Sequence, residues 1–229
     1  MANTIVVVGY GPGISSAVAE RFGSAGHPVA LVARNEERII AGAKALDAKG
    51  IKAAAIRADA SDPASIRGAI KQAREKLGPI GIVHWNAYGG TAGELLTASA
   101  EDLSGVFDVA IVGLVSAVQE AASDLKSTKG SVLVTNGGFA DIDPKVDAYA
   151  VSAKYAGLAL GNTAKHRLVG LLSKSLENDG VYVGEVIVTG MVKGSAWDNG
   201  QGNLDPSVVA DRFFELHTNR KELSVRVPG

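Results

Sequence analysis

Apolar residues gather in short continuous runs along the chain, and the longer stretches between the runs carry them at every third or fourth position. Continuous runs predict strands covered on both faces, and the wider spacing predicts amphipathic helices. The predicted strands cover 5–8, 29–32, 53–57, 80–84, 131–135, 182–188 and, with a weaker pattern, 223–227. The predicted helices cover 14–25, 36–49, 62–77, 101–125, 150–177 and 206–217.

The alternation of strands and helices is typical of right-handed crossovers in a parallel sheet. The expected fold class is therefore α/β: a single-domain, Rossmann-like, doubly wound parallel sheet of about seven strands with helices on both faces, covering residues 1–229. Asp62-Pro63 and Asp205-Pro206 each place an N-cap side chain before a proline at the first helical position. We expect the Gly- and Asn-rich segment 193–203 to be a mobile loop on the substrate side.

Composition narrows the class of protein. Lys and Arg number 23 against 24 Asp and Glu, and this balance favours neither a nucleic-acid groove nor a surface for acidic membranes. The sequence has no cysteine, which excludes disulfides and thiolate chemistry, and its dispersed histidines predict no metal site. The first apolar run is too short to cross a bilayer. We therefore expect a cytoplasmic protein that acts on a small molecule, without a nucleic-acid or membrane partner.

A glycine turn links the first predicted strand to the first predicted helix, where Gly9, Gly11 and Gly13 precede Ile14. Glycines at such a turn let the backbone approach a pyrophosphate, whose charge is met by the amides at the start of the helix. The turn therefore predicts a dinucleotide site. The alternative is that these glycines serve only the sterics of the turn.

The end of the second predicted strand indicates which dinucleotide is preferred. Arg34 and Asn35 stand where an acidic residue would accept from a ribose 2′-hydroxyl. Arginine suits a 2′-phosphate instead, because its guanidinium is always charged and can bind phosphate through two hydrogen bonds. The sequence thus favours NADP(H) over NAD(H). The alternative for Arg34 is a solvated charge paired with Glu36 or Glu37.

Two further strand ends carry residues suited to a nucleotide. Asp59 and Ala60 follow the third strand, and the carboxylate is expected either to accept from an adenine amino group or to cap the next turn. Asn86 and Ala87 follow the fourth strand, where small side chains leave room for a ribose. Because ligands of open α/β sheets bind outside the carboxyl ends of the strands, we expect all four residues near the glycine turn.

These residues together resemble the short-chain dehydrogenase/reductase family, over essentially the whole chain. The matching positions of the cofactor site are Gly9, Gly13, Ile14, Asp59, Asn86 and Ala87. Val8 and Ser15 replace the family's usual Thr and last Gly, and the segments 180–183 and 189–192 resemble its sixth strand and the turn after it. The resemblance implies that the backbone of Val192 faces the nicotinamide carboxamide.

The catalytic residues that the resemblance implies are missing. In the family a Tyr exchanges a proton with the substrate oxygen, a Lys four residues later lowers the pKa of that Tyr, and a Ser and an Asn complete the set. No Tyr stands four positions before a Lys in the 229 residues. Asn136 or Gly137 occupies the family's Ser position, and Ala110 occupies its Asn position.

Two alignments compete for the Tyr and Lys positions. Counting back from the sixth strand along the preceding helix places them at Leu158 and Asn162. Counting forward from the fifth strand places them at 149 or 150 and at 153 or 154. We prefer the first alignment, because a one-residue slip inside a helix would rotate its far end by about 100°.

Three nearby side chains are candidates to replace the missing set. Lys154 would contact the cofactor ribose, or else remain a solvated lysine at a helix start. Tyr155 would donate the proton, or else pack as a partly buried aromatic. Asn136 would polarise the substrate carbonyl through its amide. His84 lies in an apolar strand and is predicted to be a hydrogen-bonded core residue.

Three functions stay open at this point. The first is an NADP(H)-dependent oxidoreductase that exchanges a hydride with a small carbonyl or alcohol at an atypical or degenerate site. The second is a catalytically inactive NADP(H)-binding sensor, and the third is a partner subunit for an active homologue. The resemblance implies a homodimer or homotetramer formed through helices 101–125 and 150–177, unless those apolar faces merely cover the sheet.

Overall fold

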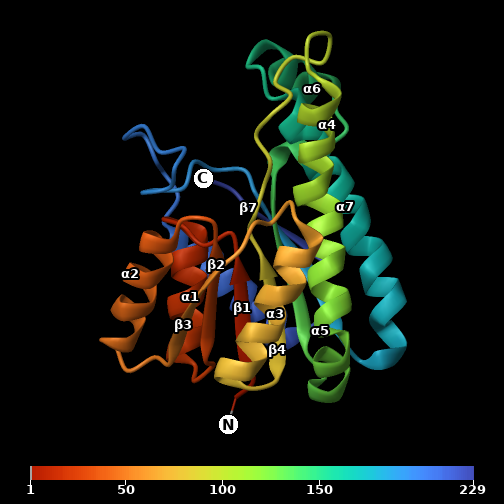
Figure 1. Cartoon of the computed structure of the whole chain (residues 1–229). Helices are drawn as coiled ribbons and strands as arrows, with labels where there is room; N and C mark the ends of the chain where they lie inside the picture. The colour runs from red at the N-terminus through yellow and green to blue at the C-terminus, as the bar shows by residue number, and fades with distance from the viewer. Residues whose placement is uncertain (1) are drawn as a thin grey trace.

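Seven parallel strands form one sheet in the order β3-β2-β1-β4-β5-β6-β7, with helices on both faces (Figure 1). The computed structural model describes residues 2–229. The strands are β1 Thr4–Val8, β2 Val29–Ala33, β3 Ala53–Arg57, β4 Ile80–Trp85, β5 Ser131–Gly137, β6 Tyr182–Val188 and β7 Ser224–Val227. The predicted fold class is confirmed, and each predicted strand is present with ends shifted by at most two residues.

The α-helices that flank the sheet are α1 Ile14–Ser24, α2 Glu36–Asp47, α3 Pro63–Leu77, α4 Ala100–Phe107, α5 Leu114–Thr128, α6 Pro144–Ser152, α7 Ala156–Leu176 and α8 Pro206–Asn219. Two of them begin as the sequence predicts. Asp62 accepts from the Ala64 amide ahead of α3, and Asp205 accepts from the Ser207 amide ahead of α8. Each cap precedes a proline at the first helical position, where its missing N–H costs nothing.

Each face of the sheet has its own apolar core. Along β1, Val6 and Val8 belong to the core shared with α3, α5 and α7, whereas Ile5 and Val7 belong to the core shared with α1, α2 and α8. All four side chains are at most 1% exposed. A strand buried on both faces has no polar face to display, which explains the continuous apolar runs in the sequence.

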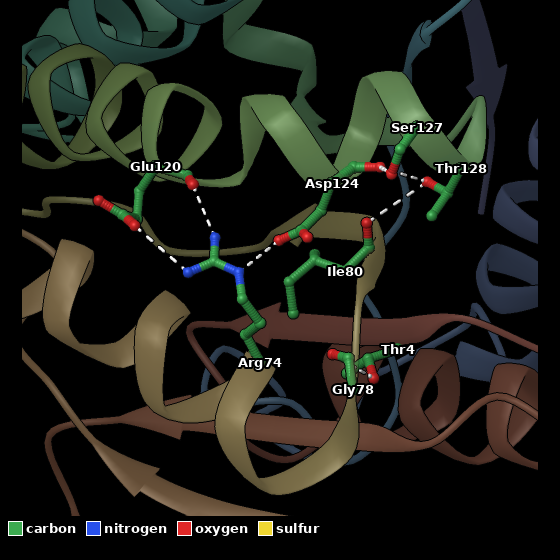
Figure 2. A network of polar contacts seen from close by, with 8 residues as sticks. All are labelled: Thr4, Arg74, Gly78, Ile80, Glu120, Asp124, Ser127 and Thr128. Atoms are coloured by element: carbon green, nitrogen blue, oxygen red, sulfur yellow. Dashed lines mark hydrogen bonds and ion pairs between the residues drawn. The ribbon is translucent and has the colours of Figure 1, made fainter.

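A polar clamp joins α3 to α5 (Figure 2). The Arg74 guanidinium donates through Nε to the Asp124 carboxylate over 2.6 Å and through Nη2 to the Glu120 carbonyl oxygen over 2.9 Å. Further along α5, the Thr128 hydroxyl contacts the Ile80 carbonyl oxygen at the start of β4, 3.4 Å away. The clamp therefore braces the amino edge of the sheet, opposite the edge where the sequence places a ligand.

The predicted helix 101–125 is a longer helical run with a π-helical segment inside it. α4 and α5 are joined by Asp108–Gly113, and the run covers Ala100–Thr128. A β-carbon on Gly113 would collide with the Ala60 carbonyl oxygen, so the glycine permits this close packing. The run is long and apolar enough to cross a membrane by length and composition alone. However, 44% of its most apolar window is buried in the fold, and α5 packs on the sheet as a core helix does.

The prediction of one helix over 150–177 is wrong. α6 ends at Ser152, Lys154 has a φ of +60°, and α7 begins only at Ala156. Two sets of hydrogen bonds make this break. The Tyr155 amide donates back to the Ala150 carbonyl oxygen over 2.7 Å and closes α6, while the Gly157 amide donates to a distant loop carbonyl, that of residue 92, over 2.8 Å. The break thus depends on a long-range partner that local periodicity does not reveal.

Candidate functional site

The candidate site lies at the carboxyl edge of the sheet, where the turn after β1 contains the predicted glycines. Gly9 has a φ of +82°, and a β-carbon on it would lie 2.5 Å from the Ala87 backbone nitrogen. Gly13 has a φ of +86°, and a β-carbon there would lie 3.1 Å from the Ser195 Cβ. Both glycines are therefore required by backbone conformation and by the close approach of another segment.

The turn leaves the first amides of α1 free for a ligand. Gly13 is the N-cap residue and supplies no side-chain cap. Ser15, which replaces the family's last glycine, is buried and locks the turn. Its hydroxyl accepts from the Gly11 amide over 2.9 Å and donates to the Gly11 carbonyl oxygen over 3.0 Å. An uncapped helix start attracts an anion, because its amides are unpaired and the helix dipole is positive there.

Two arginines stand beside this turn. Arg34 is exposed just beyond β2, near enough to Asp59 for its charge to help lower the pKa of that carboxyl. The Arg38 guanidinium lies over the turn, with Nη1 3.7 Å from the position of a Gly11 β-carbon. Sequence reasoning missed Arg38, although its position one helical turn after Arg34 was a usable signal. Asn35 caps α2 by accepting from the Arg38 amide over 2.8 Å, so this predicted cofactor residue has a structural task.

The other two predicted strand ends also face this edge and are held by local contacts. The Asp59 carboxylate accepts from the Ser61 amide over 2.9 Å and from its hydroxyl over 2.8 Å. The bond from the Ser61 amide is the main cause that lowers the pKa of Asp59. Asn86 donates to the Gly9 carbonyl oxygen over 3.3 Å, and Ala87 is buried against the same turn. Asp59 therefore caps its turn, which is one of the two roles that the sequence left open for it.

The loop 193–203 is braced around a single carboxylate. The Asp198 side chain accepts, over 2.7 to 2.9 Å, from the amides of Gly194, Gly200 and Gly202. These bonds lower the pKa of Asp198. Val192, just before the loop, is buried and pairs with Leu204 in a parallel bridge, so both ends of the loop are anchored at one place. Its mobility stays a prediction.

Three positions assigned to the missing catalytic set come together in one pocket between the π-helical segment and α7. Ala110, Leu158 and Asn162 line this pocket, together with Tyr88 and Lys165. By contrast, residue 149 is exposed on α6 and residue 154 lies in the break before α7. The alignment through Leu158 and Asn162 is therefore the one whose positions meet in space.

Asn136 is buried below this pocket rather than turned toward a substrate. Its amide nitrogen donates to the Asn162 carbonyl oxygen over 3.0 Å and to the Glu185 carboxylate over 3.1 Å. Its amide oxygen accepts from the Gly137 N–H over 3.1 Å. With both kinds of amide group used inside the protein, Asn136 is placed to position α7 against β5 and β6, not to polarise a carbonyl.

The structure separates Lys154 from Tyr155. The Lys154 side chain is 70% exposed and forms an ion pair with Glu94 over 2.5 Å, as the solvated alternative expects, and its contact with the cofactor ribose stays a prediction. Tyr155 is the N-cap residue of α7, and its ring lies 5.7 Å from the Phe139 ring and 5.9 Å from the Trp197 ring. Tyr155 therefore packs among aromatic rings, and its role as proton donor stays a prediction.

A buried charged group near the pocket was not foreseen from the sequence. Lys165 is 3% exposed and donates to the Thr135 carbonyl oxygen over 3.1 Å. Burial lowers the pKa of Lys165 to about 8, while the charge of Glu185 acts in the opposite direction. Glu185 is fully buried and also bonds to His166. The available signal was a lysine on the apolar face of a helix.

His84 is a core residue, as the sequence predicts. It is fully buried, its Nε2 lies 3.1 Å from the Thr135 hydroxyl, and its ring meets the Phe213 ring edge-on. Nδ1 is left without a hydrogen-bond partner among the described residues. Burial lowers the pKa of His84 to about 3, so the imidazole is neutral across the physiological range.

Comparisons with known proteins agree with this geometry. Residues 3–196 match the sequence profile of the family described as short chain dehydrogenase. Over 131 residues the chain is 33% identical to a meso-2,3-butanediol dehydrogenase of Serratia marcescens, in an alignment that covers 57% of this chain and 51% of that enzyme. The chain thus spans about half the length of that relative.

Solved structures share the whole fold at low sequence identity. A blue fluorescent protein from a metagenomic library, solved in complex with NADPH, superposes with a TM-score of 0.87 at 22% identity, over 100% of this chain and 97% of that one. An NADPH-bound short-chain oxidoreductase of Pseudomonas aeruginosa, described as containing an atypical catalytic centre, superposes with a TM-score of 0.86 at 20% identity, over 100% and 95%.

Proposed function

The chain belongs to the short-chain dehydrogenase family, and from this premise we propose that it is an oxidoreductase that binds NADP(H) at the glycine turn. Its substrate in this proposal is a small carbonyl compound or the corresponding alcohol. The observation that carries the proposal is the pairing of an uncapped α1 with Arg34 and Arg38 beside it.

The turn fits the two charged parts of NADP(H). The pyrophosphate would lie against the free amides of α1, where the helix dipole favours an anion. The 2′-phosphate would lie between Arg34 and Arg38, since guanidinium groups bind phosphate through two parallel hydrogen bonds. NADPH in two structures with this fold, that of the metagenomic protein and that of the Pseudomonas aeruginosa protein, supports the assignment.

The bound cofactor would supply the hydride, and the protein would position the substrate. The carboxyl edge offers Tyr155 as the proton donor in this proposal, because its phenol is a weak acid that lies beside the substrate-side loop. The pocket behind it has an Ala, a Leu and an Asn at the usual catalytic positions. Turnover is therefore expected to be slow, since loss of a general acid or base costs about 10²–10⁴ in rate. A Tyr155→Phe variant with unchanged turnover would remove this residue from the mechanism.

Cofactor binding tests the proposal directly. Purified protein is titrated with NADPH and with NADH, and nicotinamide fluorescence is followed. We expect NADPH to bind more tightly by about tenfold or more, the equivalent of one charge-assisted contact. Arg34→Ala should reduce this preference, and Arg34→Lys should restore it only in part, because lysine binds phosphate without the bidentate fork.

Three outcomes contradict parts of the proposal. Absence of binding by either nucleotide would mean that the glycine turn serves only sterics. Equal losses of NADPH and NADH affinity in Arg34→Ala would remove the 2′-phosphate assignment. Binding without turnover of any carbonyl compound would leave the inactive sensor as the function.

We also propose that two copies of the chain associate through α4, α5 and α7. Large apolar side chains are exposed on α4, on the π-helical segment between α4 and α5, and on α7, and these are Phe107, Val112, Leu160 and Leu171. Light scattering after size exclusion tests this directly, since Val112→Glu with Leu160→Glu should give a monomer if the helices pair. A wild-type monomer would contradict it.

A further inference from the structure

An aromatic cluster lies beside the candidate site. It consists of Tyr88, Phe139, Tyr149, Tyr155 and Trp197, which come from five segments at the carboxyl edge of the sheet. Successive rings contact one another at centroid distances of 5.7 to 5.9 Å. The chain has 12 aromatic residues of the Phe, Tyr and Trp types, so nearly half of them gather at this one place.

The cluster is open to solvent, unlike a core. Tyr88 is 44% exposed, Tyr149 is 59% exposed and Trp197 is 47% exposed. Aromatic rings that are this exposed to water do not gain the favourable free energy that burial of their apolar surface would give. Contiguous exposed apolar surface of this kind marks a binding site more often than it marks a fold requirement.

The loop that carries Trp197 does not need the indole to hold its shape. Asp198 braces the loop through three backbone amides, and Val192 anchors its start. The indole is therefore displayed by a framework that is complete without it. Tyr88, its neighbour at 5.7 Å, also lines the pocket beside Leu158 and Asn162. The cluster thus extends from solvent to the two residues that occupy the family's usual Tyr and Lys positions, Leu158 and Asn162.

We propose that the aromatic cluster is the substrate wall and that it selects an aromatic carbonyl compound, or the alcohol formed from it. This inference rests on the proposed function. The ring of the ligand would pack against Trp197 and Tyr88, with its carbonyl group turned toward Tyr155, whose ring lies 5.9 Å from the Trp197 ring. Hydride from NADPH would add to the carbonyl carbon while the oxygen takes a proton from Tyr155, which regains one from solvent, leaving NADP⁺ and the alcohol. A wall of aromatic rings favours a flat aromatic ligand over an aliphatic one of the same size. The reason is that a pair of aromatic rings is stabilised by more than the apolar area that it buries.

Two ketones of matched size test the proposal. Acetophenone and cyclohexyl methyl ketone differ in the aromaticity of one ring. Binding of each to the full chain is measured by calorimetry with NADP⁺ present, so that no turnover occurs, and by tryptophan fluorescence. Trp85 is fully buried and Trp197 is half-exposed, so a change that disappears in Trp197→Phe reports on the loop. Acetophenone is expected to bind about tenfold more tightly, the scale of one good aromatic contact.

Variants identify the residues responsible. Trp197→Phe should keep the preference for acetophenone, because it keeps a ring. Trp197→Ala and, independently, Tyr88→Leu should each remove most of it. Leu223→Ala, an exposed residue just before β7 at the opposite edge of the sheet, is the control that should not alter either affinity. Equal affinities for the two ketones, or no binding of either while NADPH binds, would overturn the proposal and leave the cofactor assignment intact. Acetophenone binding in a protein that binds no NADPH would instead refute the proposed function and keep the aromatic site.

Discussion

The Asn136 amide donates to the Glu185 carboxylate over 3.1 Å, and both side chains are buried. We expect Asn136→Asp to be strongly destabilising, because the isosteric change replaces a donor with a second carboxylate beside Glu185. Breaking a buried polar pair of this kind costs about 3 kcal/mol or more. Urea unfolding at pH 7 measures the loss.

The pH dependence of this loss of stability distinguishes repulsion between the two carboxylates from the mere absence of the hydrogen bond to Glu185. In the Asn136→Asp variant the introduced carboxyl faces that of Glu185, and as pH falls the introduced carboxyl takes up a proton and can donate to Glu185. The deficit of this variant should therefore shrink toward low pH. Asn136→Leu is the matched control, since its deficit should not vary with pH in the same way. Parallel curves for both variants would contradict the buried contact.

His84 makes the stability of the protein depend on pH. Its pKa is lowered to about 3 in the folded state, whereas an unfolded histidine titrates near 6.5. Below about pH 6.5 the unfolded chain binds a proton that the folded chain does not, so stability falls toward pH 3 by about 1.4 kcal/mol per pH unit from this residue. His84→Leu lacks this contribution. The difference in unfolding free energy between wild type and variant should therefore move in favour of the variant as pH falls.

A control keeps this test specific. Thr135→Val removes the hydroxyl partner of His84 but leaves the imidazole buried. It should lower stability without removing the slope between pH 6.5 and 3. A constant offset between His84→Leu and wild type across that range would mean that His84 titrates normally.

The glycine turn gives a matched pair of variants. Gly9→Ala must adopt a φ of +82° and place a methyl group 2.5 Å from the Ala87 nitrogen, so we expect a loss of stability of about 1–3 kcal/mol or more. Gly11→Ala meets only the Arg38 guanidinium at 3.7 Å and should be folded normally. Thermal unfolding and NADPH titration are run on both. Equal stability of the two variants would contradict the close approach.

Much of the fold could be predicted because its signals are local. The strands are apolar at successive positions, as in β1, and Asp62-Pro63 and Asp205-Pro206 mark helix starts that the structure keeps. The break before α7 could not be predicted, because it depends on a hydrogen bond from the Gly157 amide to the loop at residue 92. Nothing in the local periodicity near Lys154 reveals that partner.

The candidate site could likewise be predicted only where its signals are local. Gly9 and Gly13 follow from turn geometry, since positive φ and close packing require glycine. The tasks of Asn136 and Lys165 depend on which side chains meet across β5, β6 and α7. A residue type alone does not say whether an amide faces a substrate or a buried carboxylate, so the sequence pointed to Asn136 but not to its partner.

The Ser195 Cβ lies 3.1 Å from where a β-carbon on Gly13 would be, so the loop bearing Trp197 packs closely against the turn after β1. We therefore expect binding of a ketone at the loop and of NADP⁺ at the turn to be coupled, and such coupling is reciprocal by thermodynamic necessity. If a ketone raises the affinity of the protein for NADP⁺ by some factor, NADP⁺ must raise the affinity for that ketone by the same factor. The absence of a side chain at Gly13 thus allows the packing through which we expect the two ligands to influence each other's affinity.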